Sequence, residues 1–145
     1  MEKLPFKIRG TEFHDDKTVI HLHVPSHIRN TKQIEGFSQK CLSKHPHLKY
    51  HLCENDKCLS FPEELEETEL AHAFEHVLLD LIGEKDKSVR KVRGFTAWDW
   101  RKFEQDTYQI HLHYTDKNVF ESALKDAVES FNYLFGTTHV PSPIE

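Results

Sequence analysis

Residues 20–24 read Ile-His-Leu-His-Val, and residues 110–114 repeat the pattern as Ile-His-Leu-His-Tyr. In both stretches apolar and polar residues alternate, which is typical of a β-strand with one buried face. Each stretch ends a predicted hairpin that is followed by a helical pattern. We expect the strands of these hairpins at residues 6–13, 18–24, 92–103 and 107–114. The repeat predicts a single-domain α+β fold, in which one antiparallel or mixed sheet carries helices on one face.

Three helices are predicted from apolar residues that recur at helical spacing. They cover residues 30–44, 68–83 and 117–135, and Gly83 is expected to end the second one. The second helix has no counterpart in the repeat, so we interpret it as a motif-bearing helix inserted between the two halves. Residues 48–53 alternate between apolar and polar and indicate either a further strand or a loop.

Length and composition indicate a single soluble domain. The 145 residues fit one module, which we place at residues 1–136, with a flexible tail at residues 137–145. The formal net charge is −5, and Lys and Arg are dispersed, which argues against a nucleic-acid partner. Because no apolar run is long enough to span a bilayer and the first residues lack a secretory pattern, we expect a cytoplasmic protein with no membrane partner.

The second predicted helix carries the sequence His-Ala-Phe-Glu-His at residues 72–76. Residues four apart lie one above the other on a helix, so His72 and His76 can offer two imidazole nitrogens to one ion. This H-x-x-E-H order is the inverted zincin motif, in which two histidines bind zinc and the glutamate activates a water molecule. The motif predicts a Zn2+ site with His72 and His76 as metal ligands and Glu75 as the catalytic base.

A zinc hydrolase commonly needs a third protein ligand. On the last predicted helix, Glu121 and Asp126 fall at the two borders of the apolar side, where a side chain can reach a neighbouring helix. Glu121 has the longer side chain and is the favoured ligand, with Asp126 as the alternative. The strand histidines are a further source of the third ligand: His21, His23, His111 and His113. Asp80, one turn after His76, is expected to accept a hydrogen bond from the other ring nitrogen of a ligand.

Other interpretations of these residues are less specific. Two histidines and a glutamate can occur by chance on the polar side of a helix, and alternating strand histidines often form a solvated face. Cys53 and Cys58, with His51 nearby, could form a small second zinc site or respond to redox conditions. The simpler interpretation is a loop with reduced thiols, because three cysteines without an export signal do not indicate disulfides.

Two known families resemble parts of the chain. The H-x-x-E-H order with a later glutamate is similar to the motif of the pitrilysin and insulinase metallopeptidases. A longer likeness combines the histidine-glutamate-histidine helix at residues 70–81, a Gly-x-Thr turn at 94–96, a tyrosine-bounded strand at 108–114 and the helix that carries Glu121. This order of features resembles the N-terminal domain of cyanophycin synthetases.

The second resemblance implies a zinc-peptidase-like domain that cuts cyanophycin internally to provide primers. Cyanophycin has an aspartate backbone and arginine side chains. The resemblance also implies that His72, Glu75 and His76 keep their roles, and that Glu121 does so if the last helix is in register. We therefore expect a zinc-dependent hydrolase that acts on an amide bond in a peptide or an arginine-rich polymer. The alternative is a non-catalytic module of the same fold that binds such a polymer or serves in assembly.

Overall fold

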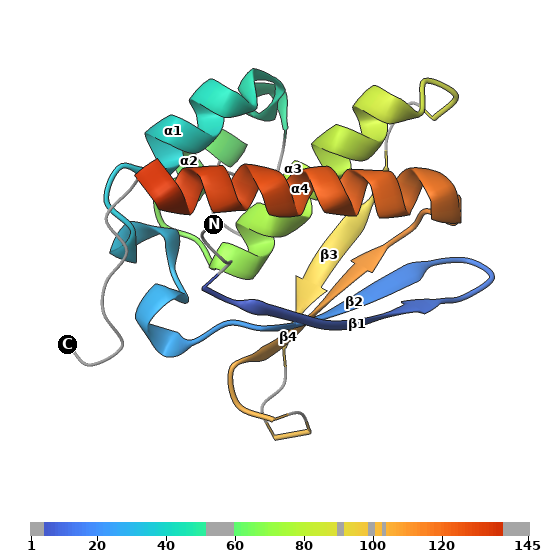
Figure 1. The fold of residues 1–145 in the computed structure, drawn as a ribbon, viewed down its shortest axis with the longest axis horizontal. Helices are drawn as coiled ribbons and strands as arrows, with labels where there is room; N and C mark the ends of the chain where they lie inside the picture. The colour runs from blue at the N-terminus through green and yellow to red at the C-terminus, as the bar shows by residue number, and fades with distance from the viewer. Residues whose placement is uncertain (1–4, 52–59, 90–91, 99–100, 103, 138–145) are drawn as a thin grey trace.

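A single antiparallel sheet forms the base of the molecule. The computed structural model describes residues 5–51, 60–89, 92–98, 101–102 and 104–137. Within these residues the strands are β1 (Lys7–Phe13), β2 (Thr18–His23), β3 (Gly94–Ala97) and β4 (Thr107–Leu112), in the sheet order β1-β2-β4-β3. The helices gather on one face of this sheet (Figure 1). The predicted α+β class, the hairpins and the one-sided helices are confirmed, and the sheet is antiparallel rather than mixed.

The two repeated sequences pair with each other at the centre of the sheet. Ile20 on β2 lies opposite Ile110 on β4, and both side chains are fully buried beneath the helices. His21 and His111 alternate with these residues and are only half-buried, as expected for the opposite face of the sheet. The period-2 pattern therefore fixes which side of each central strand receives the helices.

The helical layer contains two long helices and several short ones. Its α-helices are α1 (Phe37–Lys44), α2 (Phe61–Leu65), α3 (Leu70–Lys85) and α4 (Lys117–Thr137). Short 3-10 helices occur at Ser26–Ile28, Thr31–Gln33 and Pro46–Tyr50. In Figure 1, α4 crosses α3, and α3 also contacts β3 and β4. The motif-bearing helix α3 is therefore held between the sheet and α4.

A cluster of phenylalanine rings joins these layers. The rings of Phe74 on α3 and Phe131 on α4 meet edge to face, with centroids 4.9 Å apart. Phe6, just before β1, contacts both rings in the same edge-on manner, at 5.5 Å and 6.0 Å. Edge-to-face geometry is the arrangement that aromatic quadrupoles favour, so the cluster fixes the spacing of α3 and α4 over the sheet.

The predicted helix at residues 30–44 is wrong in its first part. Asn30 caps the short helix Thr31–Gln33, which ends at Ile34. Gly36 then adopts a left-handed backbone with φ of 74°, and the α-helix begins only at Phe37. Glycine reaches this conformation without the steric cost that other residues meet, so the chain changes direction there. The apolar spacing alone did not reveal this turn.

Two further expectations need correction. Residues 48–50 belong to the 3-10 helix Pro46–Tyr50 rather than to a strand or loop, because Pro46 has the backbone angle that suits a helix start. Gly83 does not end α3, which continues to Lys85. A glycine inside a helix costs only about 0.5–1 kcal/mol, and the buried Ile82 and Leu81 beside it offset that cost by packing.

The strand expected at residues 92–103 is shorter, since β3 covers Gly94–Ala97. The expectations for Cys53 and Cys58 lie outside the described residues, as does most of the tail expected at residues 137–145. Its first residue, Thr137, belongs to α4. Among the described helices, none combines the length and the apolar character needed to cross a membrane.

The aromatic cluster gives a stability prediction. Phe131→Ala should lower the free energy of unfolding by about 3–5 kcal/mol, because the side chain is fully buried and its loss leaves a cavity. Tyr133→Ala, two residues later on α4, should cost less than about 1 kcal/mol because Tyr133 is largely exposed. Urea unfolding followed by circular dichroism measures both values. Similar losses in the two variants would contradict the described packing of α4.

Candidate functional site

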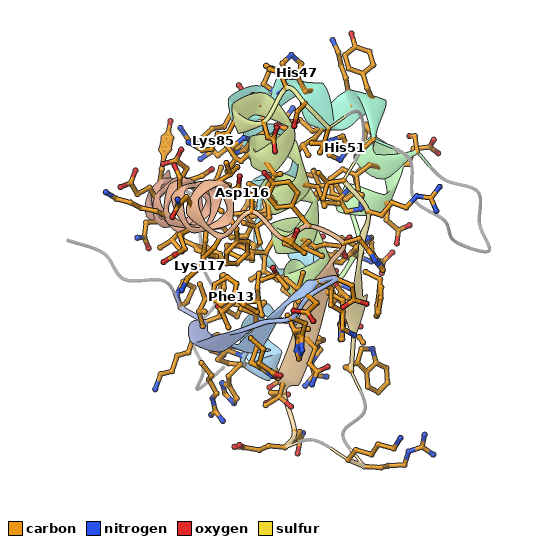
Figure 2. The ribbon with its side chains drawn as sticks, turned by 90° about the vertical axis from the view of Figure 1, so that its right-hand side faces the viewer. Phe13, His47, His51, Lys85, Asp116 and Lys117 are labelled. Carbon is orange, nitrogen blue, oxygen red and sulfur yellow. The ribbon has the colours of Figure 1, made fainter. Side chains whose placement is uncertain are left out.

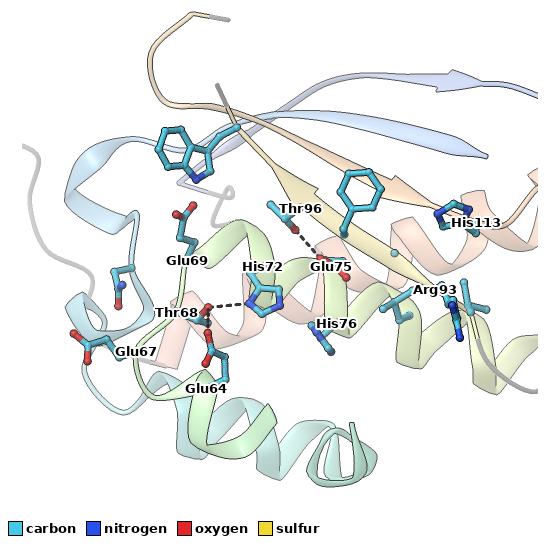
Figure 3. Close-up of a pocket in the computed structure, with 16 residues that line it drawn as sticks. Glu64, Glu67, Thr68, Glu69, His72, Glu75, His76, Arg93, Thr96 and His113 are labelled. Atoms are coloured by element: carbon cyan, nitrogen blue, oxygen red, sulfur yellow. Dashed lines mark hydrogen bonds between the residues drawn. The ribbon is translucent and has the colours of Figure 1, made fainter. Parts of the chain in front are cut away.

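The packing of α3 determines where its polar side chains point. Leu70, Phe74 and Val77 are fully buried against the core, so the helix cannot rotate about its axis without exposing them. His72 and His76 lie on another side of the helix, one turn apart, and their ring centroids are 4.8 Å apart. The structure therefore brings the two predicted histidines together, with Glu75 next to them in the chain (Figure 3).

His72 is held by a chain of hydrogen bonds that begins at α2. Oγ1 of Thr68 lies 2.8 Å from Nδ1 of His72 and 3.4 Å from Oε1 of Glu64 (Figure 3). When the hydroxyl proton is donated to Glu64, Oγ1 accepts the hydrogen bond from Nδ1 of His72. With the proton on Nδ1, the lone pair of the ring resides on Nε2. Burial lowers the pKa of His72, and the nearby Glu64 opposes that effect. A neutral ring with its lone pair on Nε2 is the form in which histidine binds metals.

His76 is more deeply buried than His72. The ring of Phe61 stacks on it at 3.9 Å, and Nδ1 of His51 lies 3.0 Å from its own Nδ1. Burial, with the charges that His72 and His51 can carry, lowers the pKa of His76 to about 2. His76 is therefore neutral at any physiological pH.

Asp80 is connected to His76 through His51 rather than directly. Asp80 Oδ1 lies 3.6 Å from Nε2 of His51, which favours a proton on that nitrogen. With the proton of His51 on Nε2, its Nδ1 accepts the hydrogen bond from Nδ1 of His76. The sequence predicted a supporting role for Asp80 but not the intervening histidine, which comes from the segment after Pro46–Tyr50 and shows no periodic signal.

Glu75 is buried on the side of α3 that faces β3. Its Oε1 accepts a hydrogen bond of 2.7 Å from the hydroxyl of Thr96 (Figure 3). Burial raises the pKa of Glu75 to about 7, although the bond from Thr96 acts in the opposite direction. A buried carboxyl group with one polar partner is typical of sites that transfer protons.

Gly94 permits the close approach of β3 to Glu75. A Cβ atom at this position would lie 2.8 Å from the backbone oxygen of His111 and 3.5 Å from Oε2 of Glu75. The first distance is shorter than real Cβ contacts, so a side chain here would push β3 away from β4. The Gly-x-Thr sequence, which lies in strand β3 and not in the expected turn, thus supplies both the space for Glu75 and the Thr96 hydroxyl that binds it.

These residues line an acidic pocket of about 920 Å³. Its charged lining residues are Glu64, Glu67, Glu69, Glu75 and Arg93. His72, His76 and His113 also line it, so imidazole and carboxyl groups share one hollow. Because the glutamates outnumber the arginine among the described lining residues, their field favours a cationic ligand.

The predicted third ligands lie in different places. Glu121 is exposed on α4 and is not among the residues that line the pocket. Asp126 forms an ion pair with Lys85, with Oδ2 and Nζ 2.7 Å apart. Of the strand histidines, His113 lines the pocket, whereas His21 pairs with Glu12 on the other face of the sheet. The structure thus places His113 in the pocket and does not place Glu121 or Asp126 there.

Glu64 is a site residue that the sequence did not reveal. It lies on α2 and lines the pocket, where Thr68 links its carboxylate to His72. The spacing offered a signal, because Glu64, Thr68 and His72 follow one another at intervals of four.

The residues fit a zinc ion in chemical type. Zinc in proteins prefers imidazole nitrogens and carboxylate oxygens, and three protein ligands leave a position for water. His72 and His76 supply two neutral imidazoles, and Glu64 is a carboxylate whose link to His72 is a single hydroxyl group. A metal-binding histidine usually has a hydrogen-bond partner on its other ring nitrogen, which orients the ring. Thr68, bonded to Nδ1 of His72, is such a partner.

Comparison with known proteins identifies a family for the chain. A search among curated proteins gave no match for the chain. Residues 17–136 match the family described as the Cyanophycin synthase-like N-terminal domain. The matched residues run from the turn before β2 into the last turn of α4 and include α3 with its histidines and Gly94 on β3. Since this match covers most of the 145 residues, the chain belongs to the family of cyanophycin synthase-like N-terminal domains.

Proposed function

We propose that the chain is a zinc-dependent, peptidase-like hydrolase that cuts an amide bond in a peptide or a cyanophycin-like polymer. The observation that carries this proposal is the arrangement on α3, where two neutral histidines lie one turn apart beside a buried glutamate. The acidic pocket around them has room for a peptide segment. Membership in the family supports a polymer substrate but does not test the reaction.

Each residue has a distinct role in this proposal. His72 and His76 hold the ion through Nε2, and Glu64 supplies a carboxylate. Zinc bound there would polarise the scissile carbonyl group and lower the pKa of a water molecule. Glu75 accepts the proton of the attacking water on its carboxylate and delivers it to the leaving nitrogen. Thr96 holds Glu75 in place, and His51 contacts Nδ1 of His76 and keeps its ring in position.

The charge of the pocket indicates the class of substrate. Glu67 is exposed at the pocket, with Nζ of Lys32 3.6 Å from its Oε1, so its carboxylate can meet a side chain that enters from solvent. A guanidinium group forms two parallel hydrogen bonds with a carboxylate, which makes arginine the best cationic match. The proposal therefore assigns arginine-bearing peptides or polymers to this pocket.

The role of Glu75 is tested by Glu75→Gln. The amide can still accept the bond from Thr96 but cannot take the proton of water, so zinc binding should persist and hydrolysis should fall by about 10²–10⁴-fold. Cleavage of cyanophycin and of a mixed peptide library is followed with and without chelator. Glu129→Gln on the exposed side of α4 is the matched control and should keep full activity. Undiminished, chelator-sensitive cleavage by Glu75→Gln would reject Glu75 as the base.

The third ligand is tested by comparing Glu64→Ala with Glu121→Ala. Zinc at about 100 times its Kd should raise the unfolding free energy of the unchanged chain by about 2.7 kcal/mol. Glu64→Ala should lose most of this gain, because its carboxylate lies in the pocket, whereas Glu121→Ala should keep it. Urea unfolding with and without zinc gives both values. The reverse result would assign the ligand to α4.

The substrate class is tested with paired peptides that carry either arginine or citrulline, which has nearly the same shape without the charge. The value of kcat/KM should be about 10- to 100-fold higher for arginine, as expected from the loss of a charge-assisted hydrogen bond. Added salt should narrow the difference. Equal values for the two peptides at low salt would show that the glutamates of the pocket do not select the substrate.

A further inference from the structure

A second group of metal-binding side chains lies farther along α3. The ligand atoms of His47, Asp80 and Glu84 all lie within 4.8 Å of one another. Asp80 and Glu84 are one turn apart on α3, and His47 comes from the 3-10 helix Pro46–Tyr50 that packs against it. His47 lies at the end of the molecule away from the sheet (Figure 2). None of the three residues lines the acidic pocket of His72.

These residues line a separate hollow of about 470 Å³. His51, His76 and Lys87 also line it, and His76 is the histidine that it shares with the acidic pocket. The two hollows therefore lie on neighbouring parts of α3. His72, His76, Asp80 and Glu84 follow one another at intervals of four, which explains why one helix serves both.

Asp80 is the strongest sign of a missing partner. Its side chain is only 7% exposed. Within the described part of the chain, its Oδ2 is buried and has no hydrogen-bond partner. Its Oδ1 lies 3.6 Å from Nε2 of His51, which is longer than a hydrogen bond. A buried carboxylate oxygen without a partner lowers the stability of the fold. A cation bound to Asp80 would remove this cost.

The spacing of the side chains suits an ion between them rather than direct contact. Nδ1 of His47 lies 3.6 Å from Oε1 of Glu84, again beyond hydrogen-bond length. Two ligand atoms that each lie about 2.1 Å from a tetrahedral zinc ion are about 3.4 Å apart. The observed separation of 3.6 Å between His47 and Glu84 is close to this value.

We propose that His47, Asp80 and Glu84 bind a divalent transition-metal ion at a site distinct from that of His72. One imidazole and two carboxylates form a ligand set suited to Zn2+ or Mn2+. The bound ion links the 3-10 helix Pro46–Tyr50 to α3, and it lies beside His51. The rival explanation is that Lys87, which lines the same hollow, neutralises Asp80 and Glu84.

The test uses the full chain, stripped with a chelator and equilibrated with ZnCl2 at a pH above the ordinary pKa of histidine. Equilibrium dialysis with metal analysis should give two zinc ions per chain. Glu84→Gln and His47→Ala should each bind one zinc ion fewer than the unchanged chain. The loss of a direct ligand should raise the Kd of that site by more than the roughly 10–100-fold seen when a residue that only hydrogen-bonds to a ligand is lost. Both residues are exposed, so these variants should fold, and Asp80→Asn, which keeps the shape of the side chain, should lose the same ion. Glu129→Gln should bind as the unchanged chain does.

The site of His72 is separated from this one by His72→Ala, which should keep the ion bound by Glu84. If zinc is lost with His72→Ala but binding is unchanged in both His47→Ala and Glu84→Gln, the second site is rejected and the proposed hydrolase keeps its metal. If zinc is lost only with His47→Ala and Glu84→Gln, the second site stands and the proposed hydrolase loses its metal. If no variant changes zinc binding, or if no zinc binds at all, both proposed metal sites are rejected. Lys87 would then be the residue that neutralises Asp80 and Glu84.

Discussion

The burial of α3 between the sheet and α4 is the constraint on which the rest of the structure depends. Leu70, Phe74 and Val77 have no exposed surface, so the rotation of the helix about its axis is fixed. Once that rotation is fixed, the residues at intervals of four from His72 must lie along one side of the helix. The apolar packing therefore positions the polar chemistry, although none of the packed residues takes part in it.

Burial also sets the protonation of the site. His76 is stacked against Phe61 and stays neutral because its environment disfavours the charged ring. The same effect raises the pKa of Glu75, which Thr96 holds from β3. An imidazole that stays neutral without a metal is ready to bind one, since it has no proton to release from the ligand nitrogen. The proposed hydrolase uses both effects of burial, namely the neutral ring of His76 and the raised pKa of Glu75.

Local sequence patterns predicted the parts of the fold that depend on regular periodicity. The repeated Ile-His-Leu-His stretches became β2 and β4, and the apolar spacing around Phe74 and Phe131 became α3 and α4. The helix predicted at residues 30–44 was wrong in its first part because the left-handed backbone of Gly36 interrupts the helix that the neighbouring residues favour. Gly83 was predicted to end the second helix, but packing of the adjacent residues keeps α3 helical to Lys85.

The candidate site was predicted chiefly where its residues lie on one helix, and the strand pattern added His113. His72, Glu75 and His76 were found from their spacing, whereas Glu64, His51 and Thr96 come from other elements and meet them through the tertiary fold. The measurement that tests the account most directly is anomalous X-ray scattering at the zinc absorption edge from crystals of the zinc-loaded protein. The account predicts a peak within bonding distance of Nε2 in both His72 and His76. Zinc peaks elsewhere in the molecule, with none at this pair, would contradict it.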